Sequence, residues 1–277
     1  GLGITLSDFN GDLWPDLFIS NDFFEKDYLY LNNNGDGFSE ESLTYFDALS
    51  MGSMGADAAD MDNDLIPDLI VTEMLPETLS RQKNKQVYES YDKFTLAGSK
   101  GYHKQYPRNA LQRNLGNTFY EVGGQLGLSA TEWSWAALLF DMDNDGYKDV
   151  YISNGIYKDL LDRDYLNYYA NDEQISQILR EGKEVITDLI DLMPSKAVTN
   201  SVFRNNGDFT FSDKRLGWGL NQPSFSNGSA YGDLDNDGDL DLVVNNVNSE
   251  AFIFENHSEV ENNNFLSFIS RDSGPYK

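Results

Sequence analysis

The stretch Asp233-Leu-Asp-Asn-Asp-Gly-Asp-Leu-Asp241 decides the fold of this chain. Aspartates stand at its positions 1, 3, 5, 7 and 9, and Gly238 stands at position 6. This spacing predicts a tight loop in which the side-chain oxygens of positions 1, 3, 5 and 9 converge, while position 7 adds a backbone carbonyl. A calcium ion takes six to eight oxygen ligands in flexible geometry, and such a loop supplies most of them. The residues 242–244, Leu-Val-Val, follow at once and predict an apolar, β-branched strand.

The same construction occurs three more times in the chain, each time followed by a similar strand. Four carboxylates in one turn repel one another unless a cation neutralises them, so the repeats predict up to four Ca²⁺ sites. The candidate ligands, with position 7 contributing its backbone carbonyl, are Asp8, Asn10, Asp12, Trp14 and Asp16 in loop 1; Asp60, Asp62, Asp64, Ile66 and Asp68 in loop 2; Asp141, Asp143, Asp145, Tyr147 and Asp149 in loop 3; and Asp233, Asp235, Asp237, Asp239 and Asp241 in loop 4.

The EF-hand is the main alternative for these loops, because its calcium loop begins in the same way. An EF-hand needs a bidentate Glu at position 12 and flanking helices. Position 12 is instead a β-branched residue in all four loops: Ile19, Val71, Ile152 and Val244. We therefore reject the EF-hand and expect the loops to connect β-strands.

Each loop lies within a pattern that predicts a four-stranded antiparallel sheet. A segment rich in small residues, such as 55–59, precedes the loop, and the apolar strand follows it. A third strand then leads through a turn such as Asn34-Gly35 or Asn206-Gly207 into a fourth, at 38 onward, 118–122 and 209–211. Such sheets repeated radially are the blades of a β-propeller. We expect an all-β fold with four blades over residues 1–258, and we expect these blades to be part of a larger propeller.

Two blades carry insertions, at about 76–107 and 155–199, which we expect to be mainly helical and to lie on the same face. Ser80 is the predicted N-cap of a helix that carries Tyr91 and Phe94. Asn171 or Asp172 is the predicted cap of a second helix, which Pro194 ends. Residues 259–277 are expected to begin a separate, following module.

Composition narrows the possible functions. The net charge is −26 and the pI about 4.1, and such a field repels nucleic acids and anionic membrane surfaces. The chain has no cysteine, which removes disulfides, cysteine–zinc sites and thiol catalysis. No apolar run is long enough to cross a bilayer, so no membrane insertion is expected.

The repeated loop and strand resemble the FG-GAP/VCBS repeat of integrin α-chain-type propellers. The stretches 109–114 (Asn-Ala-Leu-Gln-Arg-Asn), 133–136 (Trp-Ser-Trp-Ala), 141–146 and 153–155 (Ser-Asn-Gly) resemble a narrower group, the bacterial proteins related to cartilage acidic protein. Those proteins end in a UnbV/ASPIC domain, and residues 263–269 resemble its start. The resemblance implies a calcium-bearing propeller that is extracellular, on the cell surface or periplasmic, and that serves adhesion or recognition.

The first two loops depart from the repeat pattern. Leu13 and Leu65 replace the glycine of position 6, where the backbone needs freedom that leucine lacks. Asn10 also replaces one aspartate in loop 1. Calcium is therefore expected most firmly at 141–149 and 233–241.

We expect a calcium-stabilised binding or adhesion module with a glycan or protein ligand, and no catalytic residue is assigned. His103 and His257 are far apart in sequence and form no recognisable catalytic motif. A polysaccharide-active lyase or hydrolase and a purely structural spacer are the alternatives. The aromatic residues that could stack on sugar rings are Trp133, Trp135, Trp218, Tyr157, Tyr165, Tyr168 and Tyr169.

Overall fold

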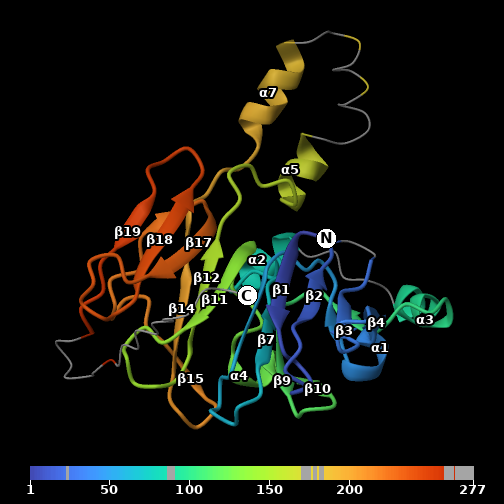
Figure 1. Ribbon diagram of the computed structural model, residues 1–277. Coiled ribbons are helices and arrows are strands. Elements are labelled where there is room, and N and C mark those ends of the chain that lie inside the picture. Colours follow the sequence, from blue (N-terminus) through green and yellow to red (C-terminus); the bar gives the residue numbers. More distant parts are fainter. Residues whose placement is uncertain are drawn as a thin grey trace.

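The computed structural model describes residues 1–22, 25–85, 91–169 and 184–258, together with the single positions 176, 180 and 265. Four small antiparallel sheets follow one another around a common axis, and a few helices lie outside them (Figure 1). The mainly β fold with four blades predicted from the loops is therefore confirmed, and the expectation that these blades belong to a larger propeller stays a prediction.

Each blade begins at the axis and runs outward in strand order. Blade 1 contains β1 (Gly3–Ser7), β2 (Asp16–Ser20), β3 (Tyr28–Asn32) and β4 (Phe38–Glu40); blade 2 contains β6 (Ala56–Ala59), β7 (Asp68–Val71), β9 (Ala110–Asn114) and β10 (Phe119–Glu121). Blade 3 contains β11 (Ser134–Phe140), β12 (Asp149–Asn154), β14 (Ser201–Asn205) and β15 (Phe211–Asp213); blade 4 contains β17 (Ser226–Gly232), β18 (Asp241–Asn246) and β19 (Phe252–Phe254). Two-stranded pairs join β5 (Leu49–Ser50) to β8 (Gln105–Tyr106) and β13 (Val198–Thr199) to β16 (Pro223–Ser224).

The hairpin turns follow the sequence pattern closely. Asn34 and Gly35 have φ of 55° and 87°, as a type I′ turn requires, and Gly207 has φ of 78°. One strand begins later than expected: Phe209 has φ of 60° and belongs to the turn, so β15 starts at Phe211.

The described parts of the insertions contain helices, together with the short strands β8 and β13. The first contains α2 (Leu79–Lys85) and α3 (Tyr91–Ser99), and the second contains α5 (Arg163–Tyr168) and α7 (Glu184–Leu192). Short helices α1 (Ser42–Tyr45) and α4 (Gly123–Leu126) lie beside blades 1 and 2. Ser80 is not the cap that the sequence predicted, because it lies inside α2, whose first turn closes on the carbonyl of Thr78. Asn171 and Asp172 lie outside the described residues, and α7 ends two residues before Pro194.

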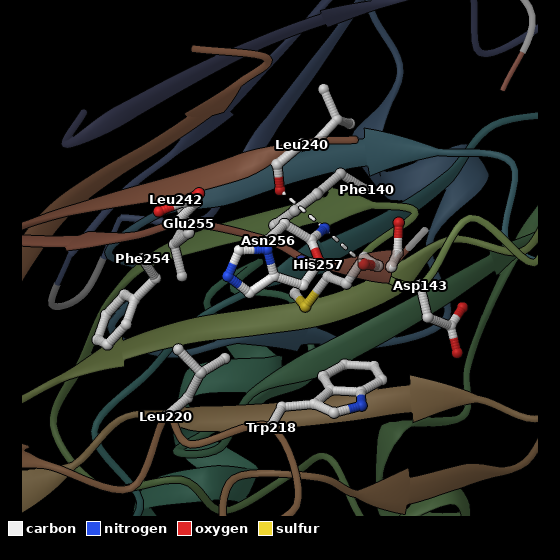
Figure 2. Close-up of a pocket in the computed structure, with 12 residues that line it drawn as sticks. Phe140, Asp143, Trp218, Leu220, Leu240, Leu242, Phe254, Glu255, Asn256 and His257 are labelled. Carbon is white, nitrogen blue, oxygen red and sulfur yellow. Dashed lines mark hydrogen bonds between the residues drawn. The ribbon is translucent and has the colours of Figure 1, made fainter. Parts of the chain in front are cut away.

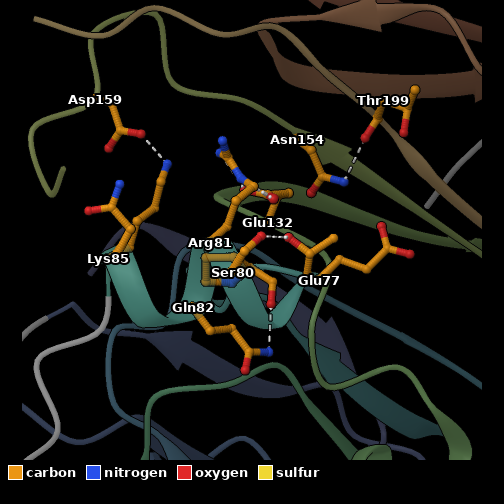
Figure 3. A network of polar contacts seen from close by, with 12 residues as sticks. Glu77, Ser80, Arg81, Gln82, Lys85, Glu132, Asn154, Asp159 and Thr199 are labelled. Carbon is orange, nitrogen blue, oxygen red and sulfur yellow. Dashed lines mark hydrogen bonds and ion pairs between the residues drawn. The ribbon is translucent and has the colours of Figure 1, made fainter.

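Side chains of α2 hold the two insertions together (Figure 3). Lys85 forms a nearly fully buried ion pair with Asp159, and the Asn84 amide donates to the Asp162 carboxylate at 3.0 Å. Arg81 donates two hydrogen bonds to Glu132, just before β11, at 2.6 and 2.8 Å. These contacts place α2 beside the second insertion, whereas α3 lies next to blade 1 (Figure 1), so the expectation that both insertions lie on one face stays a prediction.

Three apolar cores fill the spaces between successive blades. The innermost strands contact one another in the order β1, β6, β11 and β17. Small residues are needed where these strands approach, since a Cβ added to Gly55 would lie 2.2 Å from the Trp135 carbonyl oxygen. Loop position 2 of blades 1, 2 and 3 fills the core shared with the next blade, through Phe9, Met61 and Met142, which are at most 7% exposed.

A hydrogen bond repeated at each junction ties neighbouring blades together. We call the asparagines at or just after the end of the third strands of blades 2, 3 and 4 the clamp asparagines: Asn114, Asn205 and Asn256. The Nδ2 of each donates to the position-2 carbonyl of the preceding blade, which belongs to Phe9, Met61 and Met142 at 2.8, 2.7 and 2.7 Å respectively. The same Nδ2 donates to the position-8 carbonyl of its own loop, which belongs to Pro67, Lys148 and Leu240 at 3.0, 3.2 and 3.2 Å. Figure 2 shows Asn256 in this role.

No helix in the described part of the chain is long and apolar enough to span a membrane.

The hydrogen bonds of the clamp asparagines predict that replacing the buried Asn205 lowers the free energy of unfolding substantially. Asn205 is fully buried, and Asn205→Ala removes the donor to the buried Met61 carbonyl and to the part-buried Lys148 carbonyl. An unsatisfied buried group costs about 1–3 kcal/mol, so we expect a loss of about 2–5 kcal/mol in urea unfolding. Asn206→Ala is the matched control: this exposed neighbour bonds only within its own turn, and its loss should be below about 1 kcal/mol. Equal losses in the two variants would contradict the clamp.

Candidate metal centres

Loops 1, 2 and 3 share one backbone arrangement built around their first aspartate, whereas in loop 4 Asp233 accepts from the Asn236 N–H at 2.7 Å and the Asp237 N–H donates to Asp235. In loop 2, Asp60 Oδ1 accepts from the Asp64 N–H at 3.1 Å, and Oδ2 accepts from the Leu65 N–H at 2.9 Å. Asp141 accepts from Asp145 and Gly146 in the same way, at 3.0 and 2.9 Å. These bonds curl the chain around position 1 and bring positions 3 and 5 beside it.

The aspartate at position 9 connects the loop to its sheet. In blade 3, Asp149 Oδ2 accepts from the Met142 N–H at 2.9 Å, and Oδ1 accepts from the Asn205 N–H at 2.8 Å. Asp16, Asp68 and Asp241 form the same pair of bonds in their blades. Burial raises the pKa of Asp68 and of Asp149 to about 7, although these N–H donors favour the ionised form. Position 9 is thus a structural residue even before any ion is considered.

Three of the four loops bring carboxylate oxygens together. Within each set, one oxygen from every member lies within 4.8 Å of the others. The sets are Asp60, Asp62 and Asp64 in loop 2; Asp141, Asp143 and Asp149 in loop 3; and Asp233, Asp235 and Asp237 in loop 4. In loop 1, the Asn10 amide instead donates to Asp12 at 3.0 Å, so one predicted ligand pairs with another.

Position 7 has a second role that the sequence reading did not identify. Its side chain covers the glycine of the outer hairpin turn in three blades: Trp14 lies beside Gly35, Ile66 beside Gly116 and Tyr147 beside Gly207. In loop 4, Asp239 Oδ2 accepts from the Ser258 N–H at 2.9 Å instead.

Two arginines that the sequence reading missed reach into loops 2 and 3. Arg204 donates to Asp143 at 2.5 Å and to Asp145 at 2.6 Å, and Arg113 donates to Asp62 at 2.6 Å. Both stand directly before a clamp asparagine, where Leu31 and Glu255 occupy the equivalent positions of blades 1 and 4. A guanidinium neutralises part of the charge that would attract a cation, so the four loops are not equivalent.

The backbone at loop position 6 is left-handed, which is the conformation that leucine adopts poorly and glycine adopts freely. Leu13 and Leu65 have φ of 70° and 72°, in the left-handed region, and both side chains are 91% exposed. Gly146 and Gly238 have φ of 94° and 97° at the same position. A left-handed conformation costs an L-residue about 1–2 kcal/mol, so loops 1 and 2 are held in a conformation that loops 3 and 4 adopt freely.

The donor set of loop 4 fits a hard divalent cation best. Its three clustered carboxylates are exposed, its glycine permits the turn, and Glu255 stands where loops 2 and 3 have an arginine. Oxygen-only donors of this kind suit Ca²⁺ more than the softer transition metals. In loop 2, the buried Oδ1 of Asp62 has no hydrogen-bond partner among the described residues, so this oxygen is able to act as a cation ligand.

A cavity of about 240 Å³ lies between blades 3 and 4, beside loop 3 (Figure 2). Its walls include Trp218, Leu220 and Phe254, with Asp143 and His257 at its edge. Ligand sites usually measure about 300–1,000 Å³, so we interpret this space as a gap between blades.

Buried carboxyls predict that the metal-free protein loses stability as pH rises. Glu73 is 4% exposed, and burial raises its pKa to about 8; its Oε2 accepts from the Met74 N–H at 2.7 Å. Because the folded state keeps this proton while the unfolded chain releases it above about 4.5, stability falls between about pH 5 and 8. Glu73→Gln should flatten the urea-unfolding slope by about 1 kcal/mol per pH unit, measured with chelator. The exposed Glu250→Gln is the control, and an unchanged slope in Glu73→Gln would refute the assignment.

Comparison with known proteins supports the repeat seen in the fold. Residues 8–71 and 187–244 match the FG-GAP-like repeat, and these stretches contain loops 1, 2 and 4. Comparison with curated proteins gives no match. Apart from Phe265, residues 259–277 lie outside the described part of the chain, so the UnbV/ASPIC resemblance stays a prediction. The FG-GAP-like repeats and the four-blade arrangement together support an FG-GAP β-propeller.

Proposed function

We propose that this chain is a calcium-stabilised binding or adhesion module that acts where calcium is plentiful, outside the cytosol or at the cell surface. The observation that carries the proposal is loop 4, where Asp233, Asp235 and Asp237 place oxygens within 4.8 Å of one another. No arginine reaches these carboxylates among the described contacts. The FG-GAP-like match over this loop supports the same reading.

A cation in loop 4 would act on the fold and not on a reaction. The loop joins β17 to β18, and a pair of like charges 4 Å apart costs about 1–4 kcal/mol in water-like to surface-like surroundings. Removing that repulsion stabilises the connection between the inner strands of blade 4. Extracellular modules of this kind bind calcium at roughly 10⁻⁴–10⁻³ M, and we propose the same range here.

The helical insertions supply the best candidate surface for a ligand. Tyr168 is 68% exposed and Tyr169 is 44% exposed at the end of α5, and Tyr157 is 39% exposed nearby in sequence. Exposed tyrosines offer flat apolar rings and a hydroxyl, which suits both sugars and proteins. Trp135 fits packing better, since its Nε1 donates to the Gly155 carbonyl at 2.7 Å. We propose that a glycan or protein ligand binds at the tyrosines of the second insertion.

Calcium should raise the melting temperature of the purified protein, and Asp235→Asn should remove much of that gain. The reason is that loop 4 has the least internal compensation for its charge. Asp36→Asn, in an exposed turn of blade 1, is the matched control and should respond like the parent. The measurement is thermal melting with excess calcium and with chelator; identical midpoints in both would show that the loops are only acidic turns.

A calorimetric titration of Arg204→Gln extends this test to loop 3. Two unit charges about 4 Å apart interact by about 1 kcal/mol in water, which becomes about 2 kcal/mol for a divalent ion, so calcium affinity at this loop should rise roughly thirtyfold. Arg215→Gln is the control, because Arg215 pairs with Glu77 and Asp213, outside the loops. Unchanged affinity in Arg204→Gln would mean that the arginine does not oppose the ion.

Binding to a glycan array or to candidate matrix proteins should depend on calcium and on the exposed tyrosines. The double variant Tyr168→Ala/Tyr169→Ala should weaken any detected binding at least tenfold, because it removes two exposed rings without touching a blade core. Tyr120→Ala, at a 51% exposed position on β10, is the control. Binding that survives the double variant would place the ligand elsewhere, and turnover of a polysaccharide would favour the enzyme alternative.

A further inference from the structure

Positive charge is concentrated in one segment of this acidic chain. Residues 79–108 hold seven of the chain's 20 lysines and arginines but only two of its 46 acidic residues. Arg81 and Lys85, on α2, are paired with carboxylates of the protein itself. The cations of residues 91–108, which contain α3 and β8, are arranged differently. We call residues 91–108 the basic arm; Asp92 is its one acidic residue.

Two lysines of the basic arm have no counter-ion in the protein. Lys100 and Lys104 are both exposed, and neither forms an ion pair within the part of the chain that the structure describes. His103, beside Lys104, adds no charge at neutral pH, because burial lowers its pKa; its Nε2 donates to the Phe46 carbonyl at 3.0 Å. The positive charge of the arm therefore comes from long, solvent-exposed side chains.

Four aromatic side chains stand among these cations. Tyr91 is 80% exposed and Tyr102 is 50% exposed, and α3 buries none of its own residues. Phe94 stacks on Tyr106 with ring centroids 6.2 Å apart, and both rings are partly open to solvent. Apolar groups that gather on a surface in this way are characteristic of binding sites.

The base of the arm is fixed to the propeller. β8 pairs in parallel with β5, and the Leu49 N–H donates to the Lys104 carbonyl at 2.9 Å. Side chains alternate along this extended segment, so Gln105 is buried while Lys104 and Tyr106 are exposed. The Arg108 guanidinium lies over the Tyr106 ring, 5.2 Å from its centroid. A cation, a ring and a second cation are thus held close together, which lowers the entropy that a ligand must remove on binding.

Arg108 also keeps a hydrogen-bond donor available. Its Nη2 donates to Glu121 at 2.6 Å, whereas its Nη1 meets no acceptor among the described residues. Guanidinium groups bind carboxylates and similar oxyanions through charge-assisted hydrogen bonds. The arm therefore combines oxyanion donors with exposed rings.

We propose that the basic arm binds an acidic polysaccharide. Its carboxylates or sulfates contact Lys100, Lys104 and Arg108, and its sugar rings contact the exposed Tyr91 and Tyr102. Such a polymer offers both negative groups and apolar ring faces, which match the two kinds of side chain in the arm. The net charge of −26 opposes denser polyanions, since duplex DNA carries one charge per about 1.7 Å. This surface is separate from the ligand site proposed for the second insertion, because Figure 1 shows α3 apart from α5 and α7.

Fluorescence polarisation with labelled oligosaccharides measures this binding at constant calcium. Hyaluronan supplies carboxylates, keratan sulfate supplies sulfates, and desulfated keratan sulfate is the uncharged control. At least one acidic oligosaccharide should bind about tenfold more tightly than the control, and higher ionic strength should weaken it. The one that binds identifies the acidic group. Binding of neither, or equal binding of the control, would overturn the proposal, and tighter binding of oligothymidylate would overturn it in favour of a nucleic acid.

The double variant Lys100→Gln/Lys104→Gln should weaken this binding at least tenfold. Lys196→Gln/Lys214→Gln removes the same charge outside the arm and is the matched control. Thermal melting verifies that each variant is folded. Equal weakening by the two double variants would mean that only the overall charge matters, and the arm would then not be the site.

Tyr102→Ala separates ring contact from charge. It should weaken binding about fivefold while the dependence on ionic strength stays that of the parent, and an unchanged affinity would overturn the ring contact. Tyr168→Ala/Tyr169→Ala should leave the binding of the acidic oligosaccharide intact. A loss in this last variant would overturn the arm as the site and place the ligand on the second insertion, so the two proposed surfaces fail independently.

Discussion

The structure depends on the hydrogen bonds that the position-9 aspartates and the clamp asparagines make with backbone groups. A loop that turns sharply next to a buried strand leaves N–H and C=O groups without ladder partners, and such groups are costly when water is excluded. Asp149 accepts two N–H groups in blade 3, and Asn205 donates to two carbonyls. One side-chain pair thus closes the loop, ends the third strand and joins the preceding blade.

The negative charge concentrated in the acidic loops also has to be compensated, and the four loops differ in how this happens. Loops 2 and 3 receive Arg113 and Arg204, so part of their charge is neutralised by the protein itself. Loop 4 has neither an arginine nor a strained leucine, and no ion pair of its clustered carboxylates is found among the described residues. Loop 1 has fewer charges and pairs Asn10 with Asp12. The same nine-residue pattern therefore produces sites of unequal character.

Much of the fold was predictable from the sequence, because strand alternation and loop spacing are local properties. The strand following each loop, the Asn-Gly turns and the strain at Leu13 and Leu65 all depend on residues close together in the chain. The arginine contacts were not predictable in this way. Arg204 and Asp143 are far apart in sequence and come into contact only when the strands of blade 3 pair in the folded sheet. Ser80 was a misplaced cap for a simpler reason: Thr78, two residues earlier, already begins the turn.

The clamp also has a consequence for cooperativity. Each clamp asparagine reaches one blade back and no further, and each apolar core is shared by two adjacent blades. Stability is then transmitted between nearest neighbours, as in a one-dimensional array of coupled units. Interior blades are supported from both sides, whereas an end blade is supported from one. Amide hydrogens of blades 2 and 3 should accordingly exchange with solvent through rarer openings than those of an unpartnered end blade.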